Sequence, residues 1–218
     1  MLTFHIVTLF PDAFSYLSES ILGRAQKQKK IKIKFYNPRD FIKKKDGAYK
    51  AVDDRPYGGG PGMVMKAEPI LKAVARAVGK KKAKIIFFSA GGKQFIGKDA
   101  VVLSKQYKDI VLIAGHYEGV DERVARILKA HKFSVGPYVL TGGELPAMVA
   151  IDAISRHVKG VLGTHESLEE SRVASSEVYT RPEVLEYKKK NYRVPKVLLS
   201  GDHKKIESWR QKRGRASV

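Results

Sequence analysis

Three turns rich in glycine each follow an apolar run of the sequence, and chemistry is expected there first. They span Ser89–Gly92, Gly115–Gly119 and Ser134–Gly143. The third leads into a helical pattern from Glu144, with Pro146 in its first turn. Glycine lets a ligand approach the backbone, and the first N–H groups of a helix have no partner within it. A single turn of this kind is more often a plain connection, but three at the carboxyl edge of a parallel sheet predict a ligand-binding crevice.

The glycine patterns disfavour two familiar nucleotide sites. Gly91-Gly92-Lys93-Gln94 lacks the Ser or Thr and the earlier glycine of a Walker sequence, and no G-x-G-x-x-G follows a strand. The turns therefore indicate neither a phosphate loop nor a nicotinamide enzyme of the Rossmann type.

Charged residues beside the turns are candidates for binding or catalysis. His116 and Glu118 follow the apolar run that ends at Gly115, although His116 alone is more often a hydrogen-bonded structural residue. Asp121 favours the start of the next helix. No helix-spaced partners for a metal are visible, so no metal site is predicted.

A second charged group, Val52–Tyr57 (VDDRPY), precedes the glycine hinge Gly58–Gly62. A salt-bridged turn would explain these six residues alone, whereas the hinge suggests a mobile wall that closes over a substrate. Asp152 and Arg156 lie four residues apart in a helical pattern. The simplest interpretation is an ion pair worth a few tenths of a kcal/mol.

The charge of the chain points to a polyanion as partner. Its 42 Lys and Arg against 22 Asp and Glu give a net charge of +20. Nucleic acid and an acidic membrane surface both fit, and a generally lysine-rich proteome is the alternative. The chain has no cysteine, which excludes disulfides, thiolate metal sites and cysteine nucleophiles. No basic start followed by a signal-peptide core, and no apolar stretch of membrane-spanning length, is present. We therefore expect a cytoplasmic protein.

Strand and helix patterns alternate along most of the chain, which predicts an α/β domain with a mostly parallel sheet. Residues 1–160 form this domain, 161–178 a linker and 179–218 a small basic helical domain. The expected strands are Phe4–Phe10, Ile31–Tyr36, Ile85–Phe88, Ile110–Ala114 and Phe133–Leu140. The expected helices are Phe14–Gln26, Lys66–Val78, Ala100–Gln106, Asp121–Lys129 and Glu144–Val158.

Four long motifs resemble those of one family and occur in the same order. They are VDDRPYGGGPGM (Val52–Met63), GHYEGVDERV (Gly115–Val124), VGPYVLTGGELPAM (Val135–Met148) and YTRPEVL (Tyr179–Leu185). The resemblance also covers LFPDAF and NPRDF near the start and VPKVLLSGDHKKIESWR near the end. The sequence resembles the bacterial tRNA (guanine-N1)-methyltransferases of the SPOUT class, which methylate the guanine 3′ to the anticodon, at tRNA position 37.

The resemblance implies a parallel sheet with a deep trefoil knot and an obligate homodimer with its active site between subunits. It implies S-adenosylmethionine as cofactor, tRNA as substrate, no membrane, and Mg²⁺ as an aid without a fixed protein site. The implied cofactor-binding residues are Ser89, Gly92, Gly115, Tyr117, Glu118, Ser134, Val135, Gly136, Tyr138, Val139, Leu140, Gly142, Gly143 and Pro146. The implied substrate-binding residues are Asp53, Asp54, Arg55, Tyr57 and Gly60.

Methylation of guanine at N1 requires a base, because N1 normally carries a proton. By the resemblance, Arg156 contacts the guanine, and the family's base is an acid at the position of Ser175. Serine is a poor base, so our hypothesis is that the nearby Glu177 substitutes. Pro137 replaces a usual acid and cannot donate a backbone hydrogen bond.

A second function remains open at this point. The chain could be a non-catalytic RNA-binding protein on a methyltransferase-like scaffold, since its charge and Ser175 permit both. The glycine turns and Arg156 favour the enzyme, because a protein that only binds RNA needs no cofactor crevice.

Overall fold

The computed structural model describes residues 1–42, 51–162 and 177–212. The chain divides into two compact units, Met1–Gly163 and Thr164–Val218, and each is described by itself. Among the described residues, no helix combines the length and the apolar character that a membrane crossing needs.

The first unit contains a five-stranded sheet in the order β2-β1-β6-β5-β7, and every neighbouring pair is parallel. This confirms the predicted α/β class. The strands are β1 (Leu2–Val7), β2 (Ile31–Tyr36), β5 (Lys84–Gln94), β6 (Asp109–Ile113) and β7 (His131–Ser134).

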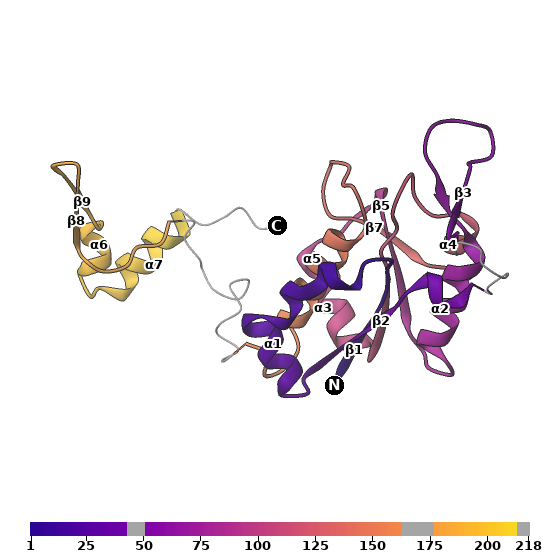
Figure 1. Cartoon of the computed structure of the whole chain (residues 1–218). Helices are drawn as coiled ribbons and strands as arrows, with labels where there is room; N and C mark the ends of the chain where they lie inside the picture. The colour runs from indigo at the N-terminus through magenta and orange to yellow at the C-terminus, as the bar shows by residue number, and fades with distance from the viewer. Residues whose placement is uncertain (43–50, 163–176, 213–218) are drawn as a thin grey trace. The chain divides into compact units, whose positions relative to one another are not determined.

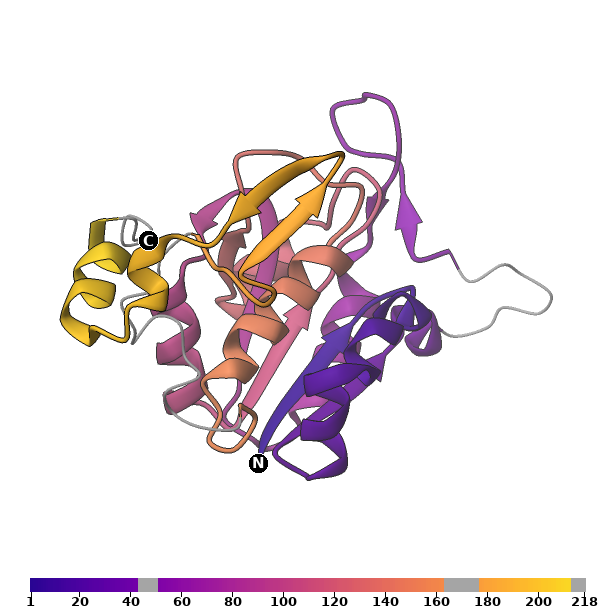
Figure 2. The same cartoon turned by 90° about the vertical axis from the view of Figure 1, so that its left-hand side faces the viewer.

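Helices cover both faces of this sheet (Figure 1). On one face, Phe4 and Ile6 of β1 join a buried cluster with residues of four helical segments, and this face is turned toward the viewer in Figure 2. Those segments are η1 (Pro11–Ser18), α1 (Ser20–Lys27), α3 (Gly97–Gln106) and α5 (Glu144–Arg156). On the other face, Val7 and Val111 pack with α2 (Ala67–Val78) and α4 (Arg123–Leu128). The short η2 (Pro38–Phe41) contacts α2 as well.

A buried polar group on the α2 face centres on His5. Its Nε2 lies 2.9 Å from Oδ1 of Asp109 and its Nδ1 lies 3.0 Å from the hydroxyl of Tyr36. Lys81 also donates to Asp109, over 2.9 Å. Burial lowers the pKa of His5 below 6.5. Burial alone would raise the pKa of Asp109, but the hydrogen bonds from His5 and Lys81 outweigh it and lower that pKa. Both shifts favour a neutral imidazole beside an ionised carboxylate near pH 7.

The expected helix Phe14–Gln26 is two segments, η1 and α1. The backbone of Glu19 is extended between them, with φ −97° and ψ 164°. Gly23 lies so close to the carbonyl of Ser18 that a Cβ would collide with it. Helical periodicity continues through this break because both segments bury apolar residues on the same face of the sheet.

The strand expected over Phe133–Leu140 ends at Ser134, so this boundary was wrong. The hydroxyl of Ser134 donates to the carbonyl of Gly136 over 2.7 Å and accepts from the Gly136 N–H over 3.3 Å, which turns the chain. Pro137 lacks the N–H that a sheet ladder needs. Residues 135–140 consequently form a loop, and the Val139 side chain there is 84% exposed.

The turn expected at Ser89–Gly92 lies inside β5 as a wide bulge. Phe88 and Lys93 both pair with Phe133 of β7, so the residues between them leave the ladder and the strand then resumes. The loop-out corresponds to the predicted turn, but the strand continues beyond it to Gln94.

The second unit contains a hairpin as well as helices. β8 (Val184–Tyr187) pairs antiparallel with β9 (Lys190–Arg193), and α6 (Lys196–Leu199) and α7 (His203–Lys212) follow. The rings of Tyr179 and Trp209 lie 6.3 Å apart within this unit. The sequence expectation of a purely helical module missed the hairpin, whose tyrosines and branched residues favour strands.

Candidate active site

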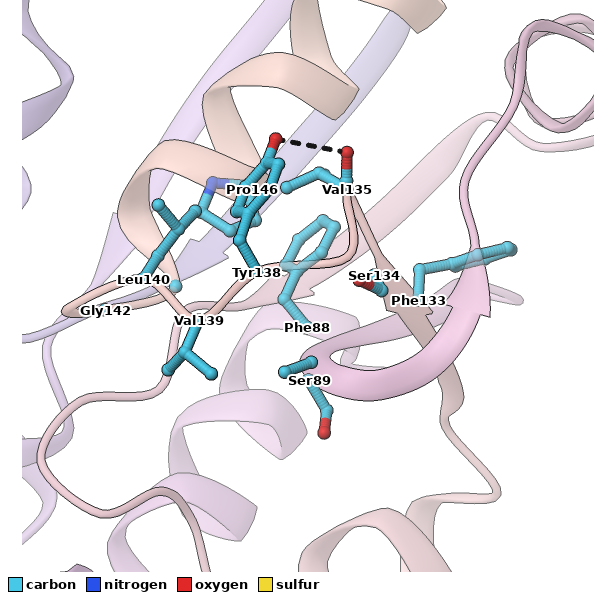
Figure 3. Close-up of a pocket in the computed structure, with 12 residues that line it drawn as sticks. Phe88, Ser89, Phe133, Ser134, Val135, Tyr138, Val139, Leu140, Gly142 and Pro146 are labelled. Atoms are coloured by element: carbon cyan, nitrogen blue, oxygen red, sulfur yellow. Dashed lines mark hydrogen bonds between the residues drawn. The ribbon is translucent and has the colours of Figure 1, made fainter.

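A cavity lies where the bulge within β5, the loop after the carboxyl end of β7 and the start of α5 meet (Figure 3). Its walls are mostly apolar and aromatic side chains, with glycine backbone on one side. The lining residues are Phe88, Ser89, Ala90, Phe133, Ser134, Val135, Tyr138, Val139, Leu140, Gly142, Gly143 and Pro146. Tyr138 folds back so that its hydroxyl donates to the carbonyl of Val135 over 3.4 Å. The cavity therefore offers apolar side chains together with backbone polar groups.

Glycine at two positions allows the loops around the cavity to touch. The N–H of Gly143 donates to the carbonyl of Gly115 over 2.7 Å, and a Cβ on Gly143 would lie 2.6 Å from Cα of Ala114. A Cβ on Gly92 would likewise lie 2.7 Å from the carbonyl carbon of Phe133. The loops after β6 and β7 and the bulge of β5 are thus in backbone contact, which only residues without a side chain permit.

A buried carboxylate lies beneath these loops. Glu144, the first residue of α5, is only 8% exposed. Its Oε1 accepts a hydrogen bond from Oγ1 of Thr8, and its Oε2 lies 3.6 Å from Nδ1 of His116. Within the described residues, that buried nitrogen of His116 has no hydrogen-bond partner. Glu144, at the start of α5, therefore contacts both Thr8, just after β1, and His116 in the loop after β6.

An arm projects from the first unit beside the loop after β6 (Figure 1). Its two sides are β3 (Asp53–Asp54) and β4 (Val64–Met65), which pair antiparallel. Tyr57 near its tip is 100% exposed.

Hydrogen bonds fasten the base of the arm to the loop after β6. Glu118 donates its N–H to the Met63 carbonyl over 3.0 Å, and Met65 donates its N–H to the Gly119 carbonyl over 2.9 Å. A Cβ on Gly62 would collide with the side chain of Glu118. The arm is thus attached to the loop that carries His116, Tyr117 and Glu118.

Comparison with known proteins gives one consistent result. The sequence profile described as tRNA (Guanine-1)-methyltransferase TrmD matches residues 2–217. Several curated tRNA (guanine-N(1)-)-methyltransferases are similar over nearly the full chain. That of Pseudoalteromonas atlantica is 45% identical, covering 96% of this chain and 78% of the relative. That of Psychromonas ingrahamii is 48% identical, covering 95% and 84%. That of Buchnera aphidicola from Acyrthosiphon pisum is 44% identical, covering 97% and 89%.

The chain belongs to the tRNA (guanine-1)-methyltransferase family.

Most of the residues to which the family resemblance assigns the cofactor surround the cavity. Nine of them line it, namely Ser89, Ser134, Val135, Tyr138, Val139, Leu140, Gly142, Gly143 and Pro146. Gly92, Gly115 and Gly136 do not line the cavity but contact residues that do, namely Phe133, Gly143 and Tyr138 in turn. Tyr117 and Glu118 lie in the loop after β6 and do not line the cavity. The sequence analysis missed Phe88, Ala90 and Phe133. Phe88 and Phe133 belong to apolar strand runs, so their sequence pattern indicated only core.

The predicted substrate-binding residues are all in the arm and do not line the cavity. Asp54 pairs with Lys66, 3.3 Å away, and its carboxylate also accepts from the Arg55 N–H over 2.9 Å. These two interactions lower the pKa of Asp54, the Arg55 N–H contributing most. Tyr57 and Gly60 are exposed beyond this anchored base.

The predicted catalytic residues are not brought together within the first unit. Arg156 is the last residue of α5 and Glu144 the first. At 1.5 Å per residue they are separated by about 18 Å along the helix axis, so Arg156 lies far from the cavity of its own chain. Glu177 is exposed in the second unit, where its Oε2 accepts from the Tyr179 hydroxyl over 3.2 Å. Ser175 lies outside the described residues.

Proposed function

We propose that this chain transfers the methyl group of S-adenosylmethionine to N1 of the guanine at position 37 of tRNA, 3′ to the anticodon. The observation that carries the proposal is the cavity between the β5 bulge, the loop after β7 and α5. It supplies the site for a nucleoside cofactor in a chain of this family.

The cavity suits the adenosine part of this cofactor. Phe88, Val139 and Pro146 offer apolar surface to a flat ring. Within the described residues, the N–H groups of Tyr138 and Leu140 make no hydrogen bond, so they are available to the ring nitrogens. The glycine backbone at Gly142 and Gly143 leaves room for close approach. Polar contacts from the backbone and apolar contacts from side chains are the combination that small-molecule sites use.

S-adenosylmethionine supplies an activated methyl group on a sulfonium, so the transfer requires no protein nucleophile. The chain must orient the guanine and remove its N1 proton as N1 attacks. We assign the proton to the carboxylate of Glu177, since serine at position 175 is a poor base without a partner. Arg156 is assigned to the guanine, where a guanidinium stabilises the negative charge left when N1 loses its proton.

A second copy of the chain is part of this proposal. Because Arg156 lies about 18 Å along α5 from the start of the helix, it would serve the cavity of a partner subunit. The exposed face of α5 supports such pairing. Leu145 and Val149 are 54% and 51% exposed and lie one turn apart beside the exposed loop of Val139. An exposed apolar patch of this kind is typical of a protein interface.

Further features of the family complete the proposal. We propose that the chain crosses itself in a deep trefoil knot, as the family resemblance implies. Residues 1–160 would be the catalytic domain, 161–178 the linker and 179–218 the tRNA-binding domain. Mg²⁺ would assist without a fixed protein site, and the tRNA substrate implies a cytoplasmic location.

Methyl transfer to tRNA transcripts tests the proposal directly. A transcript with guanine at position 37 should accept one labelled methyl group, and the same transcript with adenine there should accept none. Mapping of the product should give 1-methylguanine. Binding of the transcript without any methyl transfer, at saturating cofactor, would favour the non-catalytic RNA-binding alternative.

A further inference from the structure

The hairpin of the second unit has two chemically different faces, which its register defines. Leu185 pairs with Tyr192, and Tyr187 pairs with Lys190. Side chains alternate between faces along a strand, so these four residues share one face. Leu185, Tyr187 and Tyr192 are 55%, 59% and 54% exposed. The other face carries Val184 with Arg193 and Glu186 with Asn191. Figure 2 shows the two strands side by side in orange.

The tip of this hairpin is cationic and tightly turned. Lys188 and Lys189 join the strands, both with left-handed backbones at φ 50° and 60°. Glycine and asparagine favour this geometry, so two lysines here cost stability relative to the usual turn residues. The Lys188 ammonium lies 5.4 Å from the centre of the Tyr187 ring. The hairpin contains four cations and one acid, and that acid, Glu186, points to the other face.

We propose that the face formed by Leu185, Tyr187, Tyr192 and Lys190 stacks against unpaired RNA bases, while Lys188 and Lys189 contact the adjoining phosphates. The proposal rests on the proposed function, which supplies tRNA as the RNA. It assigns unpaired nucleotides of the substrate other than the target guanine to one face of this hairpin.

The aromatic rings of this face lie beside positive charges, and this combination favours RNA as its ligand. Exposed aromatic side chains stack on single-stranded bases whatever their sequence, and basic residues follow the phosphates. A second copy of the chain is the competing occupant. It is less favoured because a self-pairing face would bring two lysine tips and two Lys190 side chains together, and like charges at an interface oppose association.

The test compares an anticodon stem-loop RNA with a blunt RNA duplex of similar length. Fluorescence anisotropy gives the affinity of the full chain and its Tyr187→Leu and Tyr192→Leu variants for each. Leucine keeps the strand and its apolar surface but removes the stacking ring. We expect each variant to bind the stem-loop about 5- to 150-fold more weakly, the loss that removal of one stacked base causes. Affinity for the duplex should stay within twofold.

Two further sets of variants separate stacking from charge. Lys188→Gln and Lys189→Gln should each lower the dependence of log affinity on log salt by roughly 0.7 to 0.9, whereas the tyrosine variants should leave this slope unchanged. Asn191→Ala, on the opposite face, is the matched control and should bind both RNAs normally. Circular dichroism confirms that each variant is folded.

The outcomes are distinguishable. Equal losses for stem-loop and duplex, or no loss, would overturn the proposal. So would tyrosine variants that change only the oligomeric state in sedimentation, because a second copy would then occupy the face. If the chain binds stem-loop RNA through these tyrosines yet never methylates it, the proposed function fails and this inference stands. If methylation proceeds with an unchanged tRNA KM in both tyrosine variants, this inference fails alone.

Discussion

Thr8 donates a hydrogen bond from Oγ1 to Oε1 of Glu144 over 2.9 Å, although 136 residues separate the two in the chain. The bond ties the end of β1 to the start of α5, beneath the loops that surround the cavity. Oγ1 of Thr8 also accepts from the N–H of Phe10 over 3.0 Å. The Thr8 hydroxyl therefore holds two groups in place: the backbone of Phe10, just before η1, and the buried carboxylate of Glu144.

Thr8→Val should destabilise the chain, because it leaves the buried Glu144 carboxylate without this donor. An unmet buried polar group costs about 1–3 kcal/mol, more for a charged one, and urea unfolding measures it. Glu122→Gln is the control, because its pairing with Lys132 is on the surface. It should change the free energy of unfolding by less than about 1 kcal/mol. A Thr8→Val chain as stable as the parent would contradict the importance of this bond.

Gly143→Ala should impair both stability and cofactor binding. The added Cβ would lie 2.6 Å from Cα of Ala114, so the loops after β6 and β7 must separate. Overpacking of this kind costs about 1–3 kcal/mol. Calorimetry with S-adenosylhomocysteine should show weaker binding, by about 5- to 150-fold if the whole cost falls on the bound state, since 1.4 kcal/mol is tenfold. Gly91→Ala is the matched control, because a Cβ there meets nothing within 4 Å.

Mixing two inactive variants should restore activity if Arg156 serves the partner's cavity. Arg156→Ala and Gly143→Val are each expected to be inactive alone. After subunit exchange, about half of the dimers contain one of each chain, and each has one intact centre, giving about a quarter of the normal rate. A mixture that exchanges subunits but stays inactive would show that Arg156 acts within its own chain.

Glu177→Gln should slow the methyl-transfer step without weakening tRNA binding. Loss of a general base typically lowers the rate by about 10²–10⁴, and single-turnover kinetics isolate this step. Ser175→Ala should retain nearly the full rate. If Ser175→Ala slowed the methyl-transfer step more than Glu177→Gln, Ser175 and not Glu177 would be the base.

His5 should make stability depend on pH in a defined direction. Burial lowers its pKa below the ordinary 6.5, so below pH 6.5 the unfolded chain binds more protons than the folded one. The free energy of unfolding should therefore fall as the pH drops through this range. Asp109 adds a further fall only below about its ordinary value of 3.8. In His5→Gln the first decline should be reduced in pH-dependent urea unfolding. An undiminished slope would show that another group causes it.

The fold class could be predicted because strand and helix periods alternate cleanly. Strand β2 has the expected bounds because its sequence alternates apolar and lysine residues, and helix α2 has nearly the expected bounds because its apolar residues recur at helical spacing. The end of β7 could not be predicted, because Val135 and the residues after Pro137 remain apolar in a loop that surrounds a cavity. Tyr138, Val139 and Leu140 are exposed residues of the cavity wall, so their apolar character belongs to the site and not to the core.

The sequence predicted some residues of the site and missed others. The motif residues from Ser134 to Pro146 surround the cavity because they form one continuous loop and helix start. Phe133 was missed because a strand residue that also faces a cavity has the same pattern as one that faces only core. The length of α5 was enough to predict that Arg156 lies far from the cavity of its own chain. The length of α5 does not tell whether Arg156 acts in that chain or in a partner subunit.

Because Phe88 and Lys93 pair with the same residue of β7, the four residues between them add nothing to the register of the sheet. Ser89 and Ala90 nevertheless form part of the cavity wall. Substitutions there can reshape the wall while the strands on either side keep their partners. Ser89 and Ala90 are therefore positions where the cavity wall can change at low structural cost, whereas Gly92 in the same segment is held to glycine by the Phe133 backbone.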